Sequence, residues 1–94
     1  MIVVINKRAF NALIKVANFV ESQNTLGSGD RWWDKTMLEI DSLAQSKAKF
    51  AICNNESLRK FKYHCYPYGD WVIVHRLIGQ KFIVYKFIQG SRLK

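Results

Sequence analysis

The hydrophobic pattern of residues 1–46 predicts one strand followed by two amphipathic helices. The β-branched run at 2–5 is typical of a strand, and Asn6 is a suitable N-cap for a helix that follows directly. Apolar residues then recur at the helical spacing, at Phe10, Leu13, Ile14, Ala17 and Val20. The polar segment 23–29 predicts a turn, and a second helix begins at about Asp30 with an apolar stripe of Trp33, Met37, Ile40, Leu43 and Ala44. The two helices should form an antiparallel hairpin, with Trp33 buried against a sheet.

The pattern changes to the period of two in the last third of the chain. Residues 58–66 alternate and predict a strand, with Phe61, Tyr63 and Cys65 on one face and Lys60, Lys62 and His64 on the other. A turn at 67–70 leads to a strand at 71–78, and Gly79-Gln80 is a two-residue hairpin turn before a strand at 81–88. Residues 89–94 form a tail, and 45–57 are predicted to be a loop over one edge of the sheet.

These elements predict a single α+β domain over residues 1–94. Its order is an N-terminal strand, an antiparallel helical hairpin and a three-stranded antiparallel meander, which together form one sheet packed on the helices. The first strand must pair with the meander, since an unpaired edge invites aggregation.

Positive charge is concentrated in the second half of the chain. The chain has a net charge of +8, yet residues 1–46 hold five basic and five acidic residues, whereas 47–94 hold ten basic and two acidic residues. All of the excess positive charge therefore lies in the half that carries the predicted meander. Such one-sided charge favours a polyanionic or acidic partner over a generally basic surface.

The two cysteines and the apolar opening restrict the compartment. Cys53 and Cys65 are too few for a disulfide scaffold and lack the CxxC spacing of zinc sites, so each is expected to pack as a small apolar residue in a reducing compartment. The five-residue run MIVVI is too short for a signal peptide or a membrane span. We therefore expect a cytoplasmic protein without membrane contact.

The residue types exclude several chemistries and leave a basic, aromatic surface. Glu56 and Asp70 have no partner carboxylate, and GSGD at 27–30 is no phosphate loop. His64 and His75 have no ligand-spaced neighbours, so we expect no metal and no cofactor. What remains is a set of cations on the predicted strands and tail, with tyrosines among them: Lys60, Lys62, His64, Arg76, Lys86, Arg92 and Lys94. They either bind nucleic acid or simply solvate the sheet, and metal-independent RNA cleavage is a third possibility.

Four segments of the chain resemble the ParE/RelE superfamily of bacterial toxins, also called plasmid stabilisation proteins. They are NKRAF (6–10), DRWWDKTMLEIDSLAQ (30–45), SLRKF (57–61) and the closing VIVHRLIGQKFIVYKFIQGSR (72–92). The resemblance covers essentially the whole chain, and it depends on the order and spacing of the segments. It implies the toxin of a type II toxin–antitoxin module, which a cognate antitoxin protein holds neutral.

The resemblance leaves the target open between two branches of the family. ParE-like members inhibit DNA gyrase, and RelE-like members cut mRNA in the ribosome. It implies catalytic candidates Arg76, Tyr85 and Arg92, and target-binding candidates Lys60, Lys62, Lys86 and Arg92. His64 joins the binding candidates because it shares the predicted strand face of Lys60 and Lys62. Gln89 stands where the family often has histidine, and Asp70-Trp71-Val72 lacks the arginine of the nucleases. These departures favour gyrase inhibition slightly over the endoribonuclease, with a non-toxic nucleic-acid-binding relic as the third alternative.

Overall fold

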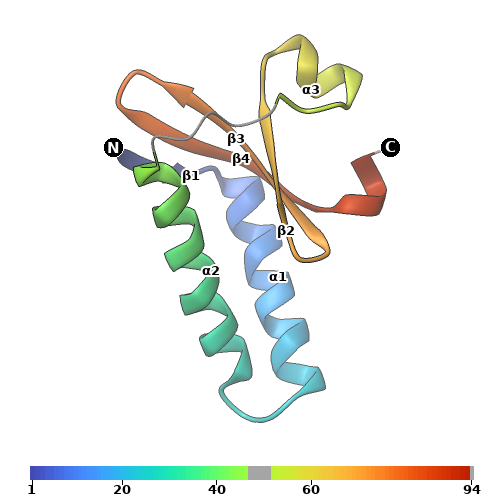
Figure 1. Cartoon of the computed structure of the whole chain (residues 1–94). Coiled ribbons are helices and arrows are strands. Elements are labelled where there is room, and N and C mark those ends of the chain that lie inside the picture. Colours follow the sequence, from blue (N-terminus) through green and yellow to red (C-terminus); the bar gives the residue numbers. More distant parts are fainter. Residues whose placement is uncertain (47–51, 94) are drawn as a thin grey trace.

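The fold has two long helices on one side of a four-stranded sheet and a short helix on the other side (Figure 1). The computed structural model describes residues 1–46 and 52–93, and the side chains of 92 and 93 lie outside this description. In chain order the elements are β1 (Ile2–Ile5), α1 (Lys7–Gln23), α2 (Ser28–Gln45), α3 (Glu56–Lys60), β2 (His64–Tyr68), β3 (Trp71–Ile78), β4 (Lys81–Gln89) and the 3-10 helix η1 (Gly90–Leu93).

The sheet confirms the predicted meander and adds a parallel pair. Its strand order is β1-β4-β3-β2, and β2, β3 and β4 are antiparallel neighbours. β1 pairs in parallel with the first half of β4, from Ile2 opposite Lys81 to Ile5 opposite Val84. Gly79 has a φ of 59°, as the first position of a two-residue hairpin turn requires. The α+β class and the pairing of β1 with the meander are therefore as predicted, whereas the parallel direction was not.

Local hydrogen bonds fix the helical hairpin. The Asn6 side-chain oxygen accepts a hydrogen bond from Ala9 N at 2.9 Å, which confirms Asn6 as the N-cap of α1. At the other end, the Glu21 carboxylate accepts hydrogen bonds from Gly27 N and Gly29 N, each at 2.7 Å. These two bonds lower the pKa of the Glu21 carboxyl, because they favour its charged form. The carboxylate thus ties the end of α1 to the start of α2.

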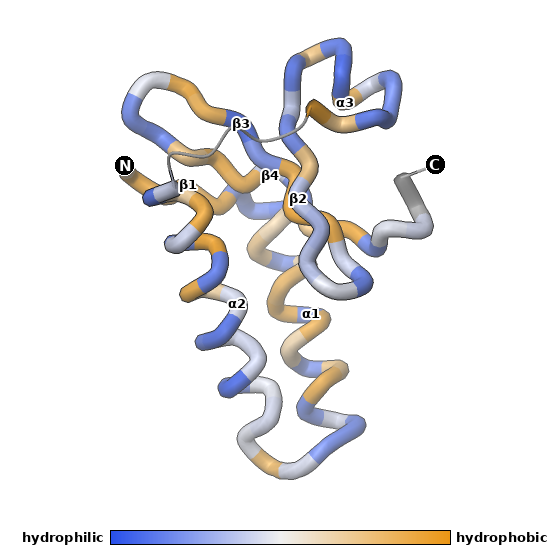
Figure 2. Tube along the Cα trace, viewed as in Figure 1, coloured by the Kyte–Doolittle hydropathy of each residue, from blue (hydrophilic) through white to orange (hydrophobic). Residues whose placement is uncertain are grey.

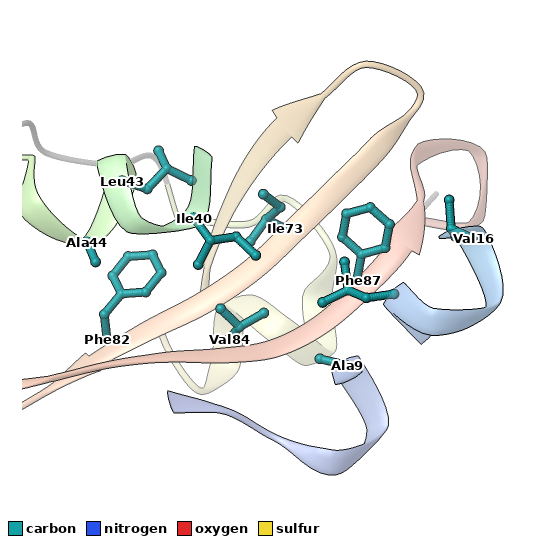
Figure 3. Packing of buried hydrophobic residues seen from close by; sticks show 10 residues of the cluster. Ala9, Val16, Ile40, Leu43, Ala44, Ile73, Phe82, Val84 and Phe87 are labelled. Atoms are coloured by element: carbon teal, nitrogen blue, oxygen red, sulfur yellow. The ribbon is translucent and has the colours of Figure 1, made fainter. Parts of the chain in front are cut away.

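The main core lies between the helical hairpin and the sheet. Figure 3 shows Ile40, Leu43 and Ala44 of α2 gathered with Ile73, Phe82 and Val84 of the sheet. The buried residues of α1 are Ala9, Leu13 and Val16, so the predicted stripe is confirmed at Leu13 and wrong at Phe10 and Ile14. Those two side chains are about 40% exposed, because the buried face of α1 is the one that carries Ala9, Leu13 and Val16. The Phe10 ring instead contacts Trp33 of α2 edge-on, with ring centroids 5.5 Å apart.

The two tryptophans of α2 contact different parts of the fold. Trp33 is half-buried and its ring contacts Phe10 of α1, so the expectation that it is buried against the sheet was wrong. Trp32 is the ring that faces the sheet, with its centroid 5.9 Å from that of Phe87 on β4. α1 and α2 cross the sheet side by side, and consecutive tryptophans therefore contact different neighbours (Figure 1).

The predicted strand at 58–66 is largely incorrect. Residues 56–60 form α3, and β2 begins only at His64 and ends at Tyr68, so that the turn itself is shorter than predicted, at 69–70. The Asn55 side chain accepts hydrogen bonds from Ser57 N and Leu58 N, while Glu56 lies in the first turn and Arg59 and Lys60 in the last. Cap and charges both favour a short helix, which outweighs the alternation of residue types. The predicted loop at 45–57 includes residues 47–51, which lie outside the described residues.

The two cysteines form a disulfide, which corrects the prediction that they pack separately. Ile52 bridges His64, and Cys53 N donates to Tyr63 O at 2.9 Å, so the chain reverses over α3. This reversal brings the Cα atoms of Cys53 and Cys65 to 4.9 Å, within bonding reach. Spacing along the chain gave no sign of it, because the reversal depends on α3. The cysteines therefore no longer support a reducing compartment.

Hydrophobic residues run along β3 and β4 and continue onto the helices that cover them (Figure 2). No helix in residues 1–46 or 52–93 combines the length and apolar character needed to cross a membrane.

Candidate nucleic-acid interface

Two stacked tyrosines with a cation beside each form a site on the face of the sheet opposite α1 and α2. The rings of Tyr63 and Tyr85 have centroids 4.5 Å apart and planes 16° from parallel. Arg76 Cζ lies 5.7 Å from the centre of the Tyr63 ring, and Lys86 Nζ lies 5.5 Å from that of Tyr85. We call these four half-buried residues the tyrosine stack. Cations at this distance are attracted to the negative faces of the rings.

A β-bulge in β4 places two consecutive residues of the tyrosine stack, Tyr85 and Lys86, on the same face of the sheet. Val74 pairs with Lys86 whereas His75 pairs with Val84, so Tyr85 is the extra residue in the ladder. Val84 and Phe87 both belong to the main core, and Tyr85 packs with Val74 on the opposite face. The bulge thus lets Tyr85 and Lys86 project from the same face, which strict alternation would forbid.

A small second core supports the tyrosine stack from below. Its buried residues are Cys53, Leu58 and Val74, and both stacked tyrosines pack against it. Leu58 comes from α3, and the Cys53–Cys65 disulfide joins the segment before α3 to β2. Tyr63 lies between α3 and β2, and its backbone accepts from Cys53 and donates to Leu58 O. The position of Tyr63 therefore depends on α3 and on the disulfide.

The structure gathers only some of the predicted site residues. Arg76, Tyr85 and Lys86 meet in the tyrosine stack, as described above. Lys60 ends α3 and Lys62 lies in the following turn with a φ of 61°, so they do not share a strand face with His64; both are exposed. Arg92 lies in η1, and its side chain lies outside the described residues.

His64 lies on the opposite face of the sheet from the tyrosine stack. Its ring stacks on that of His75 at 5.6 Å, and His75 in turn stacks on Phe82 of the main core at 4.6 Å. His75 is fully buried, and its Nδ1–H donates to Ile73 O at 3.3 Å. Burial lowers the pKa of His75 to about 4, so its imidazole is neutral at pH 7. The histidines are thus part of the packing on the helix side and cannot serve the stack.

The two tyrosines of β2, Tyr66 and Tyr68, face the long helices and pack against the main core. Tyr66 donates its hydroxyl hydrogen to a Glu39 carboxylate oxygen at 3.0 Å, and this bond raises the pKa of the Tyr66 phenol. The Tyr68 hydroxyl is 3.2 Å from the Thr36 hydroxyl, and Thr36 is fully buried. Both bonds join β2 to α2. Tyr63 and Tyr85 therefore differ from Tyr66 and Tyr68 by facing away from the long helices.

The tyrosine stack combines the groups that bind single-stranded nucleic acid. Arginine and lysine neutralise phosphates, and phenol rings stack on bases of any sequence. The two hydroxyl groups supply donors for phosphate or 2′-hydroxyl oxygens. None of the four residues is a carboxylate or an imidazole, the usual groups for proton transfer in catalysis. In the described part of the chain, no three His, Cys, Asp or Glu residues are grouped closely enough to hold a metal ion.

Tyr63 is one of several tyrosines among the predicted cations and was not singled out as a site residue, and the bulge was not predicted. One signal was present: strict alternation along 82–87 would have placed Lys86 in the core with Phe82 and Val84, which is unfavourable for a charged group. A bulge before Lys86 resolves this conflict and brings Tyr85 beside it.

No protein-family model matches the chain, and no curated protein matches its sequence.

Proposed function

We propose that this protein is the toxin of a bacterial type II toxin–antitoxin module and that its tyrosine stack binds single-stranded RNA. The observation that supports this proposal most directly is the pair of stacked rings with a cation at each. The toxin assignment also rests on the four resembling segments. A polyanionic target accounts for the concentration of positive charge in residues 47–94.

In this proposal the messenger RNA is held in an extended form on the face of the sheet. On binding, Arg76 and Lys86 move from the tyrosine rings to the flanking phosphates, and bases stack on the ring faces that they leave. Lys60 and Lys62 are exposed and precede Tyr63 in the chain, so they extend the positive field toward α3. An mRNA target places the protein in the cytoplasm, so the proposal requires that the Cys53–Cys65 disulfide persist in that reducing compartment. A cognate antitoxin holds the toxin neutral. An acidic antitoxin segment would suit the basic half of the chain.

A second candidate function is inhibition of DNA gyrase by binding alone. The observation that favours it is the absence of carboxylate and imidazole groups from the tyrosine stack, because His64 and His75 lie on the other face. A toxin of this kind needs only to occupy a surface of its target. In both candidates the stack is a contact surface, and they differ in the macromolecule that it meets.

The test is expression of matched variants in bacteria. The wild-type chain should arrest growth, and co-expression of the adjacent gene should relieve the arrest. Arg76→Ala with Lys86→Ala should abolish the arrest at equal protein level, whereas Lys35→Ala with Lys81→Ala should not. The control pair removes the same charge from exposed positions outside the stack. Growth unaffected by the wild-type chain would refute the toxin assignment, and an equally toxic stack variant would refute the site.

The target is identified in the same cells and with the purified protein. Recovery of mRNA cross-linked to the protein in the arrested cells, beside a gyrase supercoiling assay with the purified protein, separates the two candidates directly. For RNA binding, the logarithm of the association constant should fall with the logarithm of salt concentration at about 0.7 per phosphate contact on a single strand. Removing Arg76 and Lys86 should therefore reduce that slope by about 1.4. An unchanged slope would place the phosphate contacts elsewhere.

A further inference from the structure

A pocket of about 720 Å³ lies between α1 and the end of the sheet. Its walls come from the first half of α1 and from the start of β3 and the end of β4. It arises from the short first strand, since β1 pairs with β4 only as far as Val84 and the chain then turns into α1 at Asn6. This volume falls within the range of small-molecule sites.

The α1 wall of the pocket is strongly basic. Lys7, Arg8 and Lys15 line it, and Lys7, Asn11 and Lys15 follow one another at the spacing of a single helix face. Among the described residues that line the pocket, none is acidic. The first turn of α1 also holds no acidic side chain, so the positive end of the helix dipole is not offset there. The wall is therefore suited to an anionic group.

The sheet wall of the pocket is aromatic. Trp71 and Phe87 both line it, and their rings are stacked with centroids 5.1 Å apart and planes 15° from parallel. Phe87 is only 2% exposed, whereas Trp71 is half-buried, so the indole is the ring that a ligand can reach. Phe87 supports it from the core side. Asn11 and Gln89 add amide groups that can donate and accept hydrogen bonds.

A planar ring surface next to three cations matches one class of ligand. We propose that this pocket binds a nucleotide unit, with the base on Trp71 and the phosphates held by Lys7, Arg8 and Lys15. The unit is either a free nucleotide or the phosphorylated end of a nucleic-acid strand. The proposal does not rest on the toxin assignment, and its site is separate from the tyrosine stack, which shares none of the lining residues.

The test is a titration of the intact protein followed by tryptophan fluorescence. The probes are ADP, a short 5′-phosphorylated RNA, inorganic tripolyphosphate and polyglutamate. ADP or the oligonucleotide should quench the emission, and tripolyphosphate and polyglutamate should bind at least tenfold more weakly because they lack a base. Saturation by ADP assigns the pocket to free nucleotides, and binding of the oligonucleotide alone assigns it to strand ends.

Variants connect the signal to the pocket. Lys7→Ala with Lys15→Ala should weaken binding at least tenfold, and Lys35→Ala, an exposed lysine on α2, should leave it unchanged. Trp71→Phe should remove most of the quenching, since Trp32 and Trp33 do not line the pocket. The proposal is overturned if neither nucleotide probe binds at millimolar concentration, or if tripolyphosphate binds as tightly as ADP. Loss of binding in the Arg76→Ala, Lys86→Ala protein but not in the Lys7→Ala, Lys15→Ala protein would likewise overturn it.

Discussion

Tyr63 and Tyr85 stack on each other although β3 lies between the segments that carry them. Their rings meet across the outer face of that strand, over the small core around Val74. The contact therefore connects three consecutive parts of the meander. It depends on a bulge on one side and on a disulfide-linked segment on the other.

Truncation of one stacked ring should separate its aromatic role from its hydroxyl role. Base–aromatic stacking contributes about 1–3 kcal/mol per base, so Tyr85→Ala should weaken single-stranded RNA binding by about tenfold or more. Tyr85→Phe keeps the ring and should stay within about twofold of wild type, because a peripheral hydroxyl bond contributes little net free energy. Fluorescence anisotropy with a labelled oligonucleotide measures both. Equal losses in the two variants would mean that the hydroxyl and not the ring makes the contact.

Removal of the disulfide should lower stability substantially. The bond joins residues separated by 12 positions, and closing a loop of this size should contribute about 3 kcal/mol by constraining the unfolded chain. Cys53→Ser with Cys65→Ser should lose about that much free energy of unfolding in a denaturant titration. A thiol reductant should have the same effect on the wild-type protein and none on the double variant. Equal free energies of unfolding for the oxidised wild type and the double variant would contradict this contribution.

The stability of the protein should depend on pH through His75. Its pKa is about 4 in the folded protein and about 6.5 in an unfolded chain, so the unfolded state binds the extra proton between these values. The free energy of unfolding should be complete above about pH 6.5 and fall as the pH drops toward 4. The expected loss is on the order of 2 kcal/mol, since each pKa unit corresponds to at most about 1.4 kcal/mol.

His75→Phe provides the control for that titration. Phenylalanine can retain the stacking on Phe82 and does not titrate, so the slope between pH 6.5 and 4 should become much shallower. Chemical denaturation at a series of pH values measures both proteins. A slope that persists in His75→Phe would assign the effect to another group.

Gly29 should tolerate no larger side chain. A Cβ atom at this position would lie 2.6 Å from Ala17 O on α1, so α1 and α2 must separate at their loop end to admit it. Gly29→Ala should destabilise the protein by about 1–3 kcal/mol, the usual cost of overpacking, although alanine favours helices. Ser42→Ala, at an exposed position of α2, is the matched control and should change stability little. Thermal melts of the two variants decide the comparison.

The sequence predicts those elements whose hydrophobic periodicity and flanking cap or turn residues indicate the same structure. α2, β3, β4 and the Asn6 cap follow from periodicity and turn residues, and the core half of α2 is as expected. The segment 52–66 was mispredicted because its form is set by contacts distant in the chain: the Ile52–His64 bridge, the disulfide and the burial of Leu58. The tyrosine stack could be predicted only in part for the same reason, because Tyr63 lies in this segment. Arg76, Tyr85 and Lys86 could be selected by residue type, but the placement of Tyr63 required the fold.

The position of β4 in the sheet has a consequence for the order of folding during synthesis. β4 lies between β1 and β3 in the sheet and is the last strand to be synthesised. The first strand of the chain therefore pairs with the last one. Until β4 leaves the ribosome, β1 has no strand to pair with. The apolar stripe of the helical hairpin is also uncovered, because Phe82 and Val84 of β4 are part of the core that covers it. Contacts this distant in sequence slow folding and leave apolar surface open. Nascent chains that end before residue 81 should therefore be the ones that chaperones retain.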